Sequence, residues 1–119
     1  MIRVLMAEDV AAISVALEDA LADGGYTAVC FSSNAAALAW LADHTPDLAM
    51  LDLVLSDGTT VELARVLRKR GVPTLFLSGH RRELPSDMED VIWLEKPVSF
   101  EQLIGALDGL RKPMDRSQT

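Results

Sequence analysis

Two kinds of hydrophobic spacing alternate along the chain. Short apolar runs predict strands at 1–7, 26–31, 47–51, 72–77 and 91–94. Between and after these runs, apolar residues recur every three or four positions, which predicts helices at 10–23, 35–42, 61–70 and 100–110. The chain therefore alternates strand and helix over nearly its whole length.

Residues that start and stop helices lie where this alternation requires them. Asp9 is placed to cap the first helix and Ser99 the last, while Gly71 ends the third. The connection at 78–90 is different, because Pro85 interrupts it and limits any helix there to one or two turns near 86–89. We expect a shortened fourth helix at that place.

The alternation predicts the architecture. Strands joined by helices form right-handed crossovers, which build a mostly parallel sheet covered on both faces. We expect an α/β fold, a doubly wound five-stranded parallel sheet of order 2-1-3-4-5 in a three-layer sandwich. At 119 residues the chain has the length of one domain, which we place at 1–111 with a flexible tail at 112–119.

Composition narrows the class of partner. The net charge of −7 disfavours a nucleic-acid surface, since phosphate contacts need clustered lysine and arginine. No apolar stretch approaches the ~20 residues of a membrane span, and the N-terminus lacks a secretory signal pattern. The single cysteine, Cys30, suits a reducing compartment. We therefore expect a cytoplasmic protein that binds neither nucleic acid nor membrane.

Charged and hydroxyl side chains follow the predicted strands. Glu8 and Asp9 follow the first strand, Asp52 the third, Ser78 the fourth and Lys96 the fifth. The first and third strands are neighbours in the expected order, so three carboxylates converge at one sheet edge. Clustered carboxylates need cations, and oxygen ligands favour Mg²⁺. With Mg²⁺ and Lys96 as those cations, the site suits phosphoryl transfer onto Asp52, with the Ser78 hydroxyl donating to a phosphoryl oxygen.

Four motifs occur in a fixed order along the chain: Glu8-Asp9, Asp52, Ser78-Gly79 and Lys96-Pro97. Their combination resembles the receiver domain of two-component response regulators, and the resemblance covers residues 2–110. It implies that Asp52 is the phosphoacceptor and that Lys96 contacts the phosphoryl group and is joined to Pro97 by a cis peptide. It also implies that Ser78 is the hydroxyl that shifts on phosphorylation.

The resemblance further implies a ligand set for Mg²⁺. Asp9 would bind the ion directly and Glu8 through water, with Asp52 and the backbone carbonyl of Val54 as further ligands. Every position that this chemistry needs carries a suitable residue.

The chain departs from the usual receiver pattern at three positions. Ser56 and Thr60 stand where receivers commonly have proline and glycine, which predicts a redrawn loop after Asp52. Trp93 stands where the family usually has tyrosine or phenylalanine as a rotameric switch. Because tryptophan is larger and carries an N–H group, this switch would move differently or not at all.

Chemistry and resemblance together predict a phosphorylation-dependent receiver. It is not an enzyme with an external substrate, because it promotes only its own aspartyl phosphorylation and dephosphorylation. A histidine kinase or a histidine phosphotransfer protein would donate the phosphoryl group, and a downstream protein target would read the result, with the receiver a monomer or weak dimer. The initial methionine and short polar tail favour a stand-alone receiver. An alternative is a phosphorylation-independent interaction module of the same fold.

Overall fold

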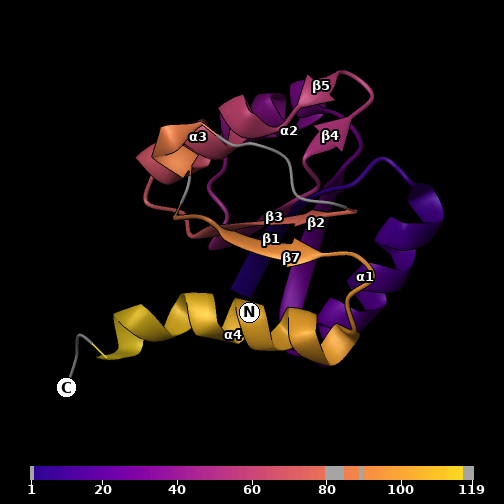
Figure 1. Cartoon of the computed structure of the whole chain (residues 1–119), viewed down its shortest axis with the longest axis vertical. Coiled ribbons are helices and arrows are strands. Elements are labelled where there is room, and N and C mark those ends of the chain that lie inside the picture. The colour runs from indigo at the N-terminus through magenta and orange to yellow at the C-terminus, as the bar shows by residue number, and fades with distance from the viewer. Residues whose placement is uncertain (1, 80–84, 89, 117–119) are drawn as a thin grey trace.

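A parallel sheet forms the centre of the molecule in the computed structural model, which describes residues 2–79, 85–88 and 90–116 (Figure 1). The parallel strands of this sheet are β1 (Ile2–Ala7), β2 (Tyr26–Phe31), β3 (Leu48–Leu51), β6 (Thr74–Ser78) and β7 (Ile92–Glu95). They lie in the order β2-β1-β3-β6-β7. Since β6 and β7 are the fourth and fifth strands of this sheet along the chain, the predicted order is confirmed.

Helices cover both faces of the sheet, as predicted for a three-layer sandwich. On one side lie α1 (Ala11–Asp23) and α4 (Phe100–Arg116), and on the other lie α2 (Asn34–Leu41), α3 (Val61–Lys69) and the short 3₁₀ turn η1 (Ser86–Met88) (Figure 1). The shortened fourth helix is thus the single turn η1, while position 89 lies outside the described residues.

Alternation along each strand divides the core into two layers. Leu5 on β1 packs in the cluster beneath α2 and α3, whereas Val4 and Met6 pack in the cluster beneath α1 and α4. Every residue of β3 is buried, because this strand is covered on both faces and flanked by β1 and β6. The acidic residues and the lysine of the predicted site follow the carboxyl ends of strands in this sheet.

The predicted cap by Ser99 is confirmed, and the predicted cap by Asp9 is wrong. Ser33 caps α2 through its hydroxyl, and Ser99 and Gln102 form a reciprocal capping box at the start of α4. The expected cap by Asp9 is wrong, since α1 begins after Val10 without a side-chain cap. Helix α4 continues to Arg116, past the expected domain end at 111, and positions 117–119 lie outside the described residues.

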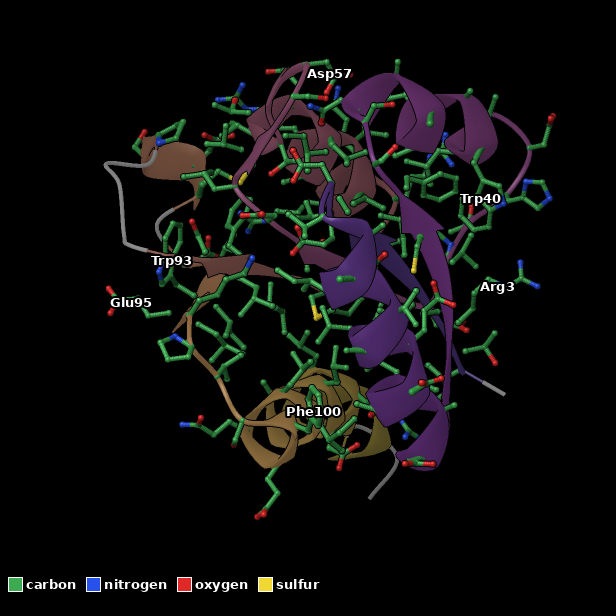
Figure 2. All side chains as sticks on the ribbon, turned by 90° about the vertical axis from the view of Figure 1, so that its right-hand side faces the viewer. Arg3, Trp40, Asp57, Trp93, Glu95 and Phe100 are labelled. Atoms are coloured by element: carbon green, nitrogen blue, oxygen red, sulfur yellow. The ribbon has the colours of Figure 1, made fainter. Side chains whose placement is uncertain are left out.

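A two-stranded hairpin that the sequence did not predict follows β3. Strands β4 (Val54–Leu55) and β5 (Gly58–Thr59) pair antiparallel around a turn at Ser56 and Asp57. Asp57 lies at the tip of this hairpin beside α2 (Figure 2). Its carboxylate accepts hydrogen bonds from the backbone N–H groups of Asn34 at 3.0 Å and Ala35 at 3.1 Å. The hairpin is thereby fastened to the first turn of α2.

Candidate functional site

The acidic residues meet where β1 and β3 end. Glu8 and Asp9 come directly after β1, and Asp52 comes directly after β3. The backbone N–H of Asp52 donates to the carbonyl of Ala7 at 3.0 Å, and that of Glu8 donates to the carbonyl of Phe31 at 3.0 Å. Sheet hydrogen bonding therefore continues past both strands and brings the carboxylates together.

These carboxylates form the predicted cluster. One oxygen atom from each of Glu8, Asp9 and Asp52 lies within 4.8 Å of the other two. The Glu8 side chain is only 3% exposed and that of Asp52 is 17% exposed, whereas Asp9 faces solvent. Buried carboxylates this close together repel each other strongly unless cations neutralise them.

Lys96 supplies one cation. Its Nζ lies 3.0 Å from Glu8 Oε1 and 3.5 Å from Asp52 Oδ2. The lysine follows β7, and its backbone N–H donates to the carbonyl of Ser78 at 2.7 Å, which holds the loop against β6. The bond between Lys96 and Pro97 is cis, as the resemblance implied.

Burial and charge shift the pKa values of this pair. Burial raises the pKa of Asp52 above its ordinary value; nearby Lys96 opposes this effect and the negative charge of Glu8 adds to it. Burial acts to lower the pKa of Lys96, but its hydrogen bond to Glu8 and the attraction of Asp52 outweigh burial and raise it. Lys96 is therefore an ammonium at neutral pH, and it offsets only part of the cost of ionising Asp52.

The loop after Asp52 accommodates the departures from the usual receiver pattern. Gly58 takes the left-handed backbone conformation, with φ of 125°, while Thr60 has φ of −95°, which any residue adopts. The Thr60 side chain is fully buried, and its hydroxyl donates to the carbonyl of Asp52 at 2.6 Å. Val54, whose carbonyl was the expected backbone ligand, opens the hairpin directly after this anchored segment.

Ser78 and Trp93 lie on the neighbouring strands β6 and β7. Ser78 is buried at the end of β6, next to the Lys96 backbone. Trp93 packs against the core beneath α2 and α3, and its ring lies 5.8 Å from that of Phe76 on β6. In Figure 2, Trp93 lies on the opposite side of the molecule from Trp40. The carboxyl ends of neighbouring strands thus carry Glu8, Asp9, Asp52, Ser78 and Lys96. Trp93 lies within β7, three residues before Lys96.

The donor set fits a hard divalent cation. In the part of the chain that the structure describes, the cluster of Glu8, Asp9 and Asp52 has metal-ligand spacing and offers only oxygen atoms. Oxygen ligands with few protein contacts suit Mg²⁺, which keeps several waters and leaves positions for phosphate oxygens. Three carboxylates against one ammonium also leave a negative charge that a divalent ion neutralises.

The model of the family described as the response regulator receiver domain matches residues 4–118. The chain belongs to this family. Membership implies a phosphoacceptor role in two-component signalling. It also confirms the resemblance on which the site residues were selected, and the receiver's sheet order and cis peptide are consistent with it.

Relatives of this receiver include longer regulators. The transcriptional regulatory protein TrcR of Mycobacterium tuberculosis is 32% identical over 117 residues, which cover 92% of this chain and 45% of TrcR. The chain thus spans about half the length of such curated relatives. Among solved structures, a sensor protein from Polaromonas sp. matches with a TM-score of 0.84 and 31% identity, covering 95% of this chain and 98% of that chain. The protein SdrG from Sphingomonas melonis matches with a TM-score of 0.78 and 31% identity, covering 92% and 96%.

Two residues that support the receiver's site loop were missed by sequence reasoning. The sequence marks Thr60 only as a departure from the usual glycine, and it assigns no role to Asp57. Both act through contacts with segments distant in sequence or with backbone carbonyls, which leave no periodic signal. The available hint for Thr60 was a threonine directly before a predicted helix, at the position where a side chain commonly caps.

Among the helices described, none is long and apolar enough to cross a membrane.

Proposed function

We propose that this receiver accepts a phosphoryl group on Asp52 from a histidine kinase or a histidine phosphotransfer protein, with Mg²⁺ bound at Glu8, Asp9, Asp52 and the Val54 carbonyl. One observation carries the proposal. One carboxylate oxygen of Asp52 lies within 4.8 Å of oxygens of Glu8 and Asp9, and its Oδ2 lies 3.5 Å from the Lys96 Nζ. A carboxylate that shares a cation site and contacts an ammonium suits attack on a phosphoryl group.

The transfer is a displacement at phosphorus. One carboxylate oxygen of Asp52 attacks the phosphorus of a phosphohistidine. As the new P–O bond forms, the P–N bond breaks and the imidazole nitrogen keeps the electron pair. Lys96 neutralises charge on the phosphoryl oxygens, and its existing contact with Asp52 Oδ2 keeps it in reach. When bound, Mg²⁺ neutralises the remaining negative charge and orients the phosphoryl oxygens.

The response to phosphorylation is assigned to Ser78 and Trp93. Ser78 ends β6 and its carbonyl accepts from the Lys96 N–H, which supports a role for its hydroxyl as a donor to a phosphoryl oxygen. Trp93 sits three residues before Lys96 on β7 and contacts Phe76 on β6. We propose that their repositioning changes the face built from η1, β7 and α4, which a downstream protein recognises. With a net charge of −7, this output is by protein contact and not by nucleic-acid binding.

Two further features belong to the proposal. The receiver acts as a monomer or weak dimer, and it catalyses only the gain and loss of its own phosphoryl group. A cytoplasmic location fits this role, because Cys30 is a free, partly buried thiol of the kind that persists in a reducing compartment.

Intact-mass measurement after incubation with acetyl phosphate tests the proposal. Wild-type protein should gain one phosphoryl group only when Mg²⁺ is present, and Asp52→Asn should gain none. The exposed helix residue Asp19 provides a matched control, because Asp19→Asn removes the same charge away from the site. If no adduct forms and beryllofluoride with Mg²⁺ also leaves the tryptophan fluorescence unchanged, a phosphorylation-independent interaction module replaces the proposal.

A further inference from the structure

The side chain of Thr60 connects the backbone of the site to the start of α3. Thr60 is fully buried, and its Oγ1 lies 2.6 Å from the carbonyl oxygen of Asp52 and 3.3 Å from that of Leu53. Its backbone N–H donates to the Leu53 carbonyl at 2.9 Å. One residue therefore holds two consecutive carbonyls of the segment that carries the phosphoacceptor.

This use of a threonine differs from its usual one at a helix start. A threonine in the N-cap position normally accepts a hydrogen bond from a free N–H of the first helical turn. Thr60 occupies the N-cap position of α3, yet its side chain makes no such bond. The hydroxyl instead directs its single proton toward the site backbone. The Thr60 side chain therefore holds the loop after β3 and does not cap α3.

Asp52 is fixed on both sides as a result. Its N–H donates to the carbonyl of Ala7, the residue before Glu8 and Asp9, and its carbonyl accepts from Thr60. The first of these hydrogen bonds joins the two halves of the acidic cluster. The second joins the cluster to α3, which is anchored in the core by Leu63 and Leu67.

We propose that Thr60 is a positioning residue for the metal site, which it builds by orienting the backbone of residues 52–54. The Asp52 carboxylate and the Val54 carbonyl project from this segment, so a rotation of its peptide planes displaces both ligands together. Loss of a hydrogen bond that orients a metal ligand commonly weakens binding of the metal. This inference rests on the proposed Mg²⁺-dependent function and adds a residue to it.

Isothermal titration calorimetry of the full chain with Mg²⁺ tests the positioning role of Thr60 without any phosphodonor. Thr60→Val removes the hydroxyl and keeps the branched shape, so the dissociation constant for Mg²⁺ should rise about tenfold. Thr60→Ser keeps the hydroxyl and should restore an affinity near that of wild type. Thr60→Gly removes the side chain and serves as a second variant, should the valine prevent folding.

Thr74 provides the matched control. It is also a buried threonine, 7% exposed, and its Oγ1 donates to a backbone carbonyl, that of Val72, at 3.0 Å. Thr74 starts β6, whereas the acidic cluster lies at the carboxyl ends of the strands. Thr74→Val should therefore lower the urea midpoint while leaving the Mg²⁺ affinity unchanged.

The outcomes separate this inference from the proposed function. If wild type binds Mg²⁺ and both Thr60→Val and Thr60→Gly bind it equally well, Thr60 has no positioning role and the inference is overturned. If Thr60→Ser loses as much Mg²⁺ affinity as Thr60→Val, the inference is also overturned, because the hydroxyl would then be irrelevant. If wild type itself does not bind Mg²⁺, the metal site and the proposed function fail together.

Discussion

Replacing Asp52 with asparagine should stabilise the protein in the absence of divalent ions, although Asp52 is the residue on which the chemistry depends. The side chain is only 17% exposed and shares its surroundings with the carboxylates of Glu8 and Asp9. Asparagine has the same shape, and its amide oxygen still accepts a hydrogen bond from Lys96. The substitution therefore removes a charge with little change in packing.

The magnitude follows from the charges around Asp52. At an effective dielectric constant of about 20, unit charges 4.8 Å apart repel by about 3.5 kcal/mol, and opposite charges 3.5 Å apart attract by about 5 kcal/mol. Two repulsions and one attraction leave a net repulsion of about 2 kcal/mol. Solvent screens the exposed Asp9, so we expect Asp52→Asn to raise the free energy of unfolding by about 1 kcal/mol.

Urea titration at pH 7 with a chelator measures this difference, with Asp19→Asn as the control for the loss of one negative charge. Addition of Mg²⁺ at about 100 times its dissociation constant should stabilise wild type by about 2.7 kcal/mol and reverse the order of the two proteins. If Asp52→Asn is no more stable than wild type with the chelator, the carboxylates are not in mutual repulsion and the reasoning is refuted.

Three further substitutions or measurements test other parts of the structure. Lys96→Gln leaves the buried Glu8 without its ammonium partner and should lower the free energy of unfolding by about 2 kcal/mol in urea titrations; an unchanged midpoint would contradict the ion pair. Asp57→Ala should lower the melting temperature at pH 7. The backbone N–H of Asn34, together with weaker donors, holds the pKa of Asp57 below its ordinary value. The stabilisation that Asp57 provides is therefore complete above pH ~3.9 and is lost as the pH falls through the lower folded-state pKa. A melting-temperature difference that persists unchanged in strong acid would argue against this role. Burial raises the pKa of Cys30 to about 12, so a thiol reagent at pH 8 should label native protein far more slowly than urea-unfolded protein, and equal rates would count against a buried thiol.

The sheet and the convergence of the site residues could be predicted because both depend on regular patterns. Alternating strand and helix periods restrict the topology, and strand ends in a parallel sheet meet at one edge. The proximity of Glu8, Asp52 and Lys96 could therefore be predicted without knowledge of any side-chain contact. The short turn at η1 was predictable for a similar reason, since Pro85 limits helix formation locally.

The remaining features depend on contacts between distant segments. Asp57 bonds with Asn34, which lies 23 residues earlier in the chain, so nothing near Asp57 in sequence indicates its partner. Asp9 is a residue type that commonly caps helices, but α1 starts two residues later and the Glu8 carboxylate instead accepts from the Val10 N–H at 3.2 Å. Thr60 is also a common capping residue, yet its hydroxyl donates to the Asp52 carbonyl. In each case a local preference was outweighed by the geometry of the sheet edge.

The most direct test of the central claim is to locate the phosphoryl group on the chain. Protein treated with acetyl phosphate and Mg²⁺ is reduced with borohydride, which converts an aspartyl phosphate to homoserine, and the peptides are then sequenced by mass spectrometry. Homoserine is expected at position 52 and should disappear when Mg²⁺ is withheld. Homoserine at position 9 or elsewhere, with Asp52 unmodified, would contradict the assignment of the phosphoacceptor.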